Sequence, residues 1–179
     1  MRHMKINLLI VFILFNILIP IKSSAEMLNN AKFEKVSIEE GLSNEYVTSI
    51  FQDSKGYIWI GTKDGLNRFD GEKVKIYNCN AEDKNSLSST YINDIEEDVN
   101  GNIWIATDSG LDFLVTDSDT ITRMKDMETD KYNLGNLKIT SLLKSEQEEH
   151  IMWVGTEKGL IKVDVLKNKM EAFYHNEND

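Results

Sequence analysis

Acidic and histidine side chains are the first residues of this 179-residue chain that could do chemistry. Glu148 and Glu149 could form the carboxylate pair of a glycosidase. Such carboxylates need a fixed separation across a cleft, which neighbouring residues of one loop do not supply. His150 and His175 lie far apart in different loops, and nothing suggests a shared metal ion. No Ser-His-Asp arrangement or glycine-rich phosphate loop can be assembled. We therefore predict that the chain is not an enzyme and has no catalytic residue, metal site or cofactor.

Two further groups of residues could bind a ligand. The sequence Asp98–Asn102 is similar to the start of a calcium loop, but the glutamate that completes such a loop is missing at the required spacing. The same residues suit a hairpin turn, which we favour. Tyr57, Tyr91 and Tyr132 could stack against a sugar, and they could equally be structural aromatics of strands or loops. The sequence therefore identifies no ligand-binding residue.

A repeated segment indicates the elements that hold these residues. The three tryptophans of the chain, Trp59, Trp104 and Trp153, are 45 and 49 residues apart. A small residue follows each tryptophan two positions later, and a glycine follows four positions after that. These residues are Gly61 and Gly65, Ala106 and Gly110, and Gly155 and Gly159. A two-residue insertion in the polar stretch Ser145–His150 accounts for part of the wider second spacing. A period near 45 residues fits a four-stranded propeller blade or a helical repeat.

The local pattern favours the blade. Residues 46–53 are rich in β-forming residues, Asp53–Gly56 is a turn, and Lys63–Gly65 is a tight turn in which Gly65 is expected at positive φ. No segment after residue 30 shows a convincing helical period with caps. We therefore predict an all-β fold, a β-propeller of four-stranded antiparallel blades. The expected strands are residues 46–53, 57–62, 66–70 and 73–77, then 91–98, 102–107, 111–116 and 119–125, then 137–145, 151–156, 160–165 and 170–174.

The tryptophan strand should be central in each blade, with its ring filling the space between neighbouring blades. The small residue that follows should let this strand approach its neighbour closely. These are structural roles, and we assign them to the nine repeat-defining residues named above.

The chain holds about three such blades, at residues 42–80, 87–126 and 134–175. Because propellers typically close with four to eight blades, three blades make an incomplete ring. Residues 33–38 look like a fourth strand without its sheet, so we expect them to close the ring with a partial blade that is absent from the chain. Residues 176–179 would begin the link to the next blade, and we interpret the chain as truncated.

The first residues predict export. A basic start, an apolar run over residues 6–19 and the small residues Ser23–Ala25 are typical of a signal peptide over residues 1–25, followed by a leader over residues 26–32. An uncleaved membrane anchor is the alternative, although the run is shorter than a bilayer span. With 20 basic and 30 acidic residues, the chain should repel nucleic acid. Its one cysteine, Cys79, allows no internal disulfide.

Four motifs resemble the two-component regulator propeller repeat family, namely Glu40–Asn44, Gln52–Gly56, Trp59–Thr62 and Asp64–Gly71. The resemblance covers about residues 33–179. It implies the exported sensor region of a bacterial receptor, which continues into a membrane helix and a cytoplasmic histidine kinase or diguanylate cyclase. It also implies a response to carbohydrate breakdown products.

The sequence departs from the family pattern at three places. Lys84 stands where a proline is common, and Ala106 replaces the usual glycine of the second blade. Residues 146–150 replace an Asp-x-x-Gly turn, so the hairpin loop of the third blade should be longer.

The leading hypothesis is a ligand-sensing domain on the periplasmic or extracellular face of the bacterial membrane. Its expected partners are a small molecule, with an oligosaccharide as the implied class, and the remaining blades of the same receptor. Contact with the membrane is expected only through the signal segment or a downstream helix absent from the chain. A ligand should bind at a mouth of the central channel or across a propeller face. A self-assembling propeller module and a fragment of a secreted glycosidase or lyase are the alternatives.

Overall fold

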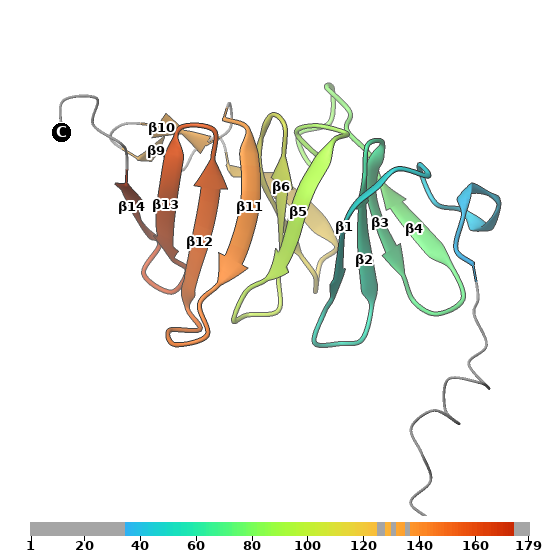
Figure 1. Ribbon diagram of the computed structural model, residues 1–179, viewed down its shortest axis with the longest axis horizontal. Helices are drawn as coiled ribbons and strands as arrows, with labels where there is room; N and C mark the ends of the chain where they lie inside the picture. Colours follow the sequence, from blue (N-terminus) through green and yellow to red (C-terminus); the bar gives the residue numbers. More distant parts are fainter. Residues whose placement is uncertain (1–34, 125–127, 130–131, 135–136, 174–179) are drawn as a thin grey trace, which may run out of the picture. The chain divides into compact units, whose positions relative to one another are not determined.

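Three four-stranded antiparallel sheets make up most of the chain that the computed structural model describes, residues 35–124, 128–129, 132–134 and 137–173 (Figure 1). The predicted signal segment and leader lie outside these residues. All the elements below belong to the unit Val36–Asp179. In each sheet the four strands follow one another in sequence order, as in a propeller blade. The predicted all-β fold of three blades is therefore confirmed.

Every strand predicted for the three blades is present, with bounds that differ by at most two residues. Blade 1 contains β1 (Val47–Gln52), β2 (Ile58–Thr62), β3 (Gly65–Phe69) and β4 (Val74–Tyr77). Blade 2 contains β5 (Ile92–Glu97), β6 (Ile103–Thr107), β7 (Gly110–Val115) and β8 (Thr120–Arg123). Blade 3 contains β11 (Ile139–Lys144), β12 (Ile151–Thr156), β13 (Gly159–Asp164) and β14 (Lys169–Phe173). A small hairpin of β9 (Glu128–Thr129) and β10 (Tyr132–Asn133), which was not predicted, lies between blades 2 and 3 in the sequence.

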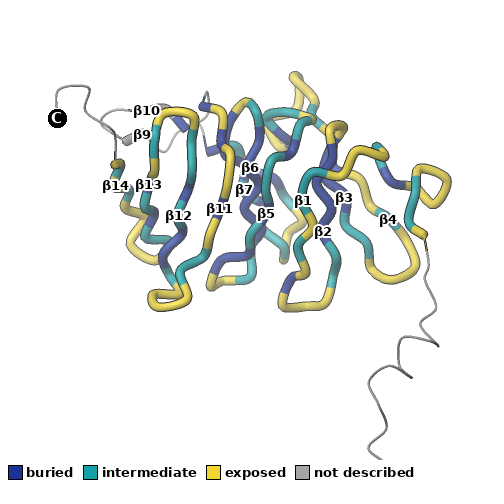
Figure 2. The backbone as a smooth tube through the Cα atoms, viewed as in Figure 1, coloured by how far each residue is buried: buried dark blue, intermediate teal, exposed yellow. Residues whose placement is uncertain are grey.

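The core consists of two layers, each between successive blades. We define the front of a blade as the face toward the preceding blade and the rear as the opposite face. The rear of blade 1 packs on the front of blade 2 through Trp59, Leu66, Tyr77, Ile95, Ile103, Ile105, Leu114 and Ile121. The rear of blade 2 packs on the front of blade 3 through Trp104, Ala106, Leu111, Met124, Leu142, Met152, Val154, Ile161 and Val163. Figure 2 shows the buried segments along the strands and the exposed ones mainly at the turns. Removing this apolar surface from water is the main stabilising contribution to the stack.

The turn after each tryptophan strand is built in the same way. A threonine ends the strand, and its hydroxyl donates to the carbonyl of the glycine three residues later, for example from Thr62 to Gly65 at 2.9 Å. Gly65, Gly110 and Gly159 have φ values of 111°, 144° and 144°, so the positive φ expected at Gly65 is confirmed. A Cβ at Gly65 would lie 2.8 Å from the carbonyl oxygen of Tyr77, so a side chain has no room there.

The segment expected to form an N-terminal strand is different in the described residues. Residues 35–37 belong to no strand, and Ile38–Glu40 forms the short 3₁₀ helix η1. Ser37 caps this helix, because its backbone N–H donates to Glu40 at 2.8 Å and its hydroxyl accepts from the N–H of Glu39 at 3.3 Å. An extended segment needs a partner strand for its backbone groups, whereas this helical turn satisfies some of them locally. Closure of a ring by residues 33–38 therefore stays a prediction.

The two outward faces of the stack are only partly covered. Ile50 at the front of blade 1 is 68% exposed, whereas Ile95 at the same position of blade 2 is 3% exposed. Leu160 at the rear of blade 3 is 40% exposed, whereas Leu111 of blade 2 is fully buried. Positions whose side chains are buried between two blades in the interior of the stack are therefore exposed to solvent at its two ends. Within the described residues, no helix is long and apolar enough to span a bilayer.

Candidate functional site

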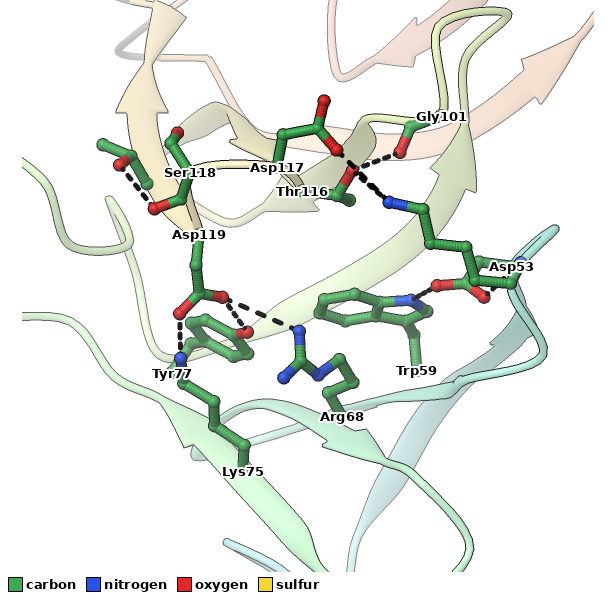
Figure 3. A network of polar contacts seen from close by, with 12 residues as sticks. Asp53, Trp59, Arg68, Lys75, Tyr77, Gly101, Thr116, Asp117, Ser118 and Asp119 are labelled. Atoms are coloured by element: carbon green, nitrogen blue, oxygen red, sulfur yellow. Dashed lines mark hydrogen bonds and ion pairs between the residues drawn. The ribbon is translucent and has the colours of Figure 1, made fainter.

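The indole of Trp59 is held in the first junction by a buried carboxylate. Trp59 is fully buried, and its N–H donates to Asp53 Oδ2 at 2.8 Å (Figure 3). The other oxygen of Asp53 accepts from the backbone N–H groups of Lys55 and Tyr57 at 3.0 and 2.9 Å. One aspartate therefore closes the β1–β2 turn and fixes the ring that fills the space between the blades.

Blade 2 repeats this arrangement. Trp104 donates to Asp98 Oδ2 at 3.1 Å, and Asp98 Oδ1 accepts from the N–H groups of Asn100 and Asn102 at 2.8 and 3.0 Å. The sequence Asp98–Asn102 is thus the hairpin turn that we favoured. Among the described residues, no group of three or more His, Cys, Asp or Glu side chains could hold a metal ion.

Blade 3 has no carboxylate in the corresponding place. Ser145 begins its longer β11–β12 loop, with its N–H donating to Ile151 at 2.9 Å. Trp153 is only half-buried, and its ring centroid lies 6.0 Å from that of Phe173, which is 43% exposed. The tryptophan of blade 3 therefore lacks both the acceptor and the covering blade that the other two have among the described residues.

Asp119 connects blade 2 to the outer strands of blade 1. It lies in the β7–β8 turn with a φ of 54° and contacts Lys75, the hydroxyl of Tyr77 at 2.6 Å, and Arg68 Nη1 at 3.7 Å (Figure 3). Burial alone would raise the pKa of Asp119, but the hydrogen bonds from Lys75 and Tyr77 and the charges of Lys75 and Arg68 outweigh it and lower the pKa. Burial and the bond to Asp119 raise the pKa of Tyr77 far above its usual value.

Carboxylates also connect the first strands of successive blades. Asp94 of β5 accepts from the hydroxyl of Ser49 in β1 at 3.1 Å and from the backbone N–H of Leu142 in β11 at 2.8 Å. Glu97, at the end of β5, accepts from the N–H and hydroxyl of Ser54 at 2.9 and 2.7 Å. Figure 1 shows β1, β5 and β11 side by side along one side of the stack, where the channel of a complete propeller would lie.

Aromatic and charged side chains gather where these first strands begin. The ammonium of Lys63 lies 3.5 Å from the ring centroid of Tyr46. In the next blade, Lys138 lies 2.8 Å from Asp108 and 5.9 Å from the ring centroid of Tyr91. Burial alone would raise the pKa of Asp108, but its bonds from Lys138 and Asn93 lower it. We define Tyr46, Lys63, Tyr91, Asp108 and Lys138 as the mouth cluster, which combines aromatic ring faces with hydrogen-bonding groups.

The other candidate residues do not belong to the mouth cluster. The guanidinium of Arg68 lies 4.9 Å from the ring centroid of Tyr57, so this ring is engaged within blade 1. The side chain of Tyr132 and the whole of His175 lie outside the described residues. His150 Nε2 lies 3.9 Å from a carboxylate oxygen of both Glu148 and Asp164.

The small residue after the tryptophan lies where successive blades approach. A Cβ placed on Gly61 would lie 2.8 Å from Cγ2 of Ile92 in blade 2. Ala106 at the same position in blade 2 is fully buried. At Gly155 the nearest obstacle is Ser141 of its own blade.

Sequence reasoning missed two features of the junctions. It treated Asp53 and Asp98 as turn residues only, although both stand six residues before a tryptophan and the third repeat has none there. It also missed Asp119, whose partners are more than forty residues away in the sequence and carry no local signal.

Comparison with known proteins agrees with this architecture. A family model described as two component regulator propeller matches residues 41–64 and 86–109, the first half of blades 1 and 2. This confirms the resemblance inferred from the motifs. "Histidine kinase P4" of Formosa agariphila is 47% identical over 58 residues, which are 32% of this chain and 4% of that protein.

Solved structures are similar over a larger part of the chain. The extracellular domain of the hybrid two component system BT3049 from B. thetaiotaomicron matches with a TM-score of 0.69 and 28% identity, over 79% of this chain and 20% of that one. Virginiamycin B lyase from Staphylococcus aureus matches with a TM-score of 0.51 and 15% identity, over 72% of this chain and 41% of the enzyme, a likeness of fold alone. The chain thus spans about a fifth of the length of the extracellular domain that it matches.

Proposed function

The chain carries two component regulator propeller repeats, and from this premise we propose that it is part of the extracytoplasmic, ligand-sensing propeller of a bacterial signalling receptor. The observation that carries the proposal is the similarity to the extracellular domain of a hybrid two component system, at 28% identity over most of the chain. The short match to a histidine kinase supports the same class of receptor.

The mouth cluster is the surface that we assign to the ligand. It lies where the loops of successive blades converge, and its members come from blades 1 and 2 and the start of blade 3. Its tyrosine rings can contact the apolar face of a sugar, and its lysines and aspartate can bond hydroxyl groups. A carbohydrate-like ligand therefore fits the chemistry of this surface better than an anionic one, since the chain has a net charge of −10.

Binding to a panel of oligosaccharides tests the proposal. We expect at least one sugar to raise the melting temperature of the protein, and Tyr91→Ala to remove that increase, because ligand binding stabilises the folded state. Tyr57→Ala is the matched control, since Tyr57 lies in the β1–β2 turn, at the opposite end of blade 1 from the mouth cluster. If no sugar shifts the melt, or if both variants respond alike, the mouth cluster is not a carbohydrate site.

Export is tested separately. A fusion of the chain to an alkaline phosphatase that is active only outside the cytoplasm should be active, and deletion of residues 1–25 should abolish the activity. Activity without residues 1–25 would contradict the assignment of the signal segment.

A second candidate function is supported by the exposed ends of the stack. Ile50 and Leu160 are largely exposed at positions that are buried inside the stack, so a self-assembling propeller module would cover both. Light scattering of the purified chain distinguishes this module from part of a receptor propeller, because a self-assembling module forms a defined oligomer.

A further inference from the structure

The second inter-blade junction contains a pocket of about 340 Å³. The rear of blade 2 lines it with Trp104, Phe113 and Met124, and blade 3 lines it with Val163, Val165 and Asn168. It lies toward the β5–β6 and β13–β14 turns, which are at the opposite end of the blades from the mouth cluster. The site is therefore independent of the ligand surface proposed above.

The repeat provides an internal comparison for this pocket. Arg68 stands opposite Trp59 in the strand register of blade 1, and Phe113 stands opposite Trp104 in blade 2. One strand further out, Lys75 of blade 1 corresponds to Thr122 of blade 2. The facing turns also correspond, because Asp119 and Asn168 are their residues with positive φ, 54° and 51°.

In the first junction all three positions carry charged side chains, namely Arg68, Lys75 and Asp119. Asp119 contacts Lys75, Arg68 and Tyr77 together, and the guanidinium of Arg68 lies 5.8 Å from the ring centroid of Trp59. In the second junction the charged residues are replaced by phenylalanine, threonine and asparagine. The ion-pair network is thereby removed, and the space beside the tryptophan is left as a pocket.

The lining of the pocket indicates the chemistry of its occupant. The rings of Trp104 and Phe113 meet edge to face, with centroids 5.8 Å apart and planes at 90°, so they form two perpendicular aromatic walls. The amide side chains of Asn100 and Asn168 stand at the rim, and neither has a hydrogen-bond partner among the described residues.

The charged groups beside the pocket are already engaged. Asp98 accepts from the indole of Trp104 and from two turn amides. The guanidinium of Arg123 donates to the carbonyls of Asn80, Ser86 and Leu87 in the loop between blades 1 and 2. A charged ligand would therefore be desolvated without a counter-charge, which is unfavourable.

We propose that this pocket binds a small neutral aromatic molecule of one or two rings that carries a hydrogen-bonding group. An apolar cavity of about 150 Å³ is enough to hold benzene, and ligand pockets typically begin near 300 Å³. The ring lies against Trp104 and Phe113, and its polar group is bonded by the amides at the rim.

Indole is a suitable probe, and the three tryptophans report on it separately. The full chain is labelled with 5-fluorotryptophan, the three ¹⁹F resonances are assigned with Trp→Phe variants, and indole is titrated. We expect a saturable shift of the Trp104 resonance with a Kd on the order of 1 mM, while the Trp59 resonance stays unchanged. An unmoved Trp104 resonance, or equal shifts of all three, would overturn the proposal.

Two variants fill the pocket in different ways. Phe113→Arg with Thr122→Lys and Asn168→Asp reproduces the first junction, and Val165→Phe adds a single ring. Each is expected to weaken indole binding at least about tenfold while retaining a cooperative thermal melt. The reciprocal variant, Arg68→Phe with Lys75→Thr and Asp119→Asn, should create a response at Trp59. Unchanged affinity in a folded pocket-filling variant would contradict the assignment, and Val165→Phe provides this test if the triple variant does not fold.

Discussion

The carboxylate of Asp53 accepts the indole N–H of Trp59 at 2.8 Å, so the turn after the first strand is joined to the ring that separates two blades. Both residues are buried, with Asp53 5% exposed. A buried carboxylate is stable only when its oxygens are fully bonded, and here the indole and two turn amides provide the bonds. The aspartate therefore belongs to the packing of the junction as much as to the turn.

Asp53→Ala should destabilise the protein by about 1–3 kcal/mol, because it leaves the indole N–H and two backbone N–H groups without their acceptor. Urea unfolding monitored by circular dichroism measures the change. Asp64→Ala is the control, since Asp64 is exposed in the β2–β3 turn and its removal should change stability by less than about 0.5 kcal/mol. Equal effects at both positions would show that the bond to Trp59 contributes nothing.

Trp59→Ala and Trp153→Ala should have different costs although they alter the same repeat position. Removal of the fully buried Trp59 should cost about 3–5 kcal/mol. Trp153 is half-buried and lacks a covering blade among the described residues, so its removal should cost less than half as much. A further blade joined to the C-terminus, so that it covers Trp153, should abolish the difference. A large cost for Trp153 in the chain alone would mean that another surface already covers it.

Gly61→Val should destabilise the first junction by about 1–3 kcal/mol, because even a Cβ at this position would lie 2.8 Å from Cγ2 of Ile92. The opposite change at the same position of blade 2, Ala106→Gly, removes a methyl group without a clash and should cost only about 1 kcal/mol. Thermal melts of both variants provide the measurement. A neutral Gly61→Val would indicate that the two blades can separate slightly without loss of stability.

Asp119 should make the first junction sensitive to acid. Its folded pKa is lowered, so the carboxylate contributes stability that is present above the unfolded pKa, near 3.9, and is lost as the pH falls through the folded pKa. Asp119→Asn should therefore be less stable than the parent at about pH 7, and the gap should narrow toward about pH 3. Urea midpoints at several pH values test this. A gap that does not change with pH would mean that the contacts of Asp119 act by shape rather than by charge.

Much of the fold could be predicted from the sequence because one residue type marks the repeat. The three tryptophans align the repeats, and each strand then follows from β-type patterning between turn residues such as Gly65 and Gly110. The ends of the elements were accurate to two residues for the same reason. The small hairpin β9–β10 was missed, since its two-residue strands leave no pattern to read.

The contacts between blades could not be predicted in the same way. The bond from Asp119 to Tyr77 depends on how far one blade is rotated against the next, which no local pattern encodes. The pocket beside Trp104 could not be predicted from a local pattern either. It forms because Phe113 and Asn168, which lie on the two sides of the second junction, stand where the first junction has Arg68 and Asp119. The segment near Ser37 could not be predicted for a different reason. Its extended residue pattern has no partner strand, and the capping box at Ser37 stabilises a short 3₁₀ helix instead.

The contact between successive blades always joins a rear face to a front face, and it therefore has a direction. Ile50 at one end of the stack and Leu160 at the other belong to unlike surfaces, so two chains that meet through them associate head to tail. Such a heterologous contact either closes into a ring or extends as a polar filament. The number of blades between the two exposed faces therefore decides whether assembly ends by itself or continues.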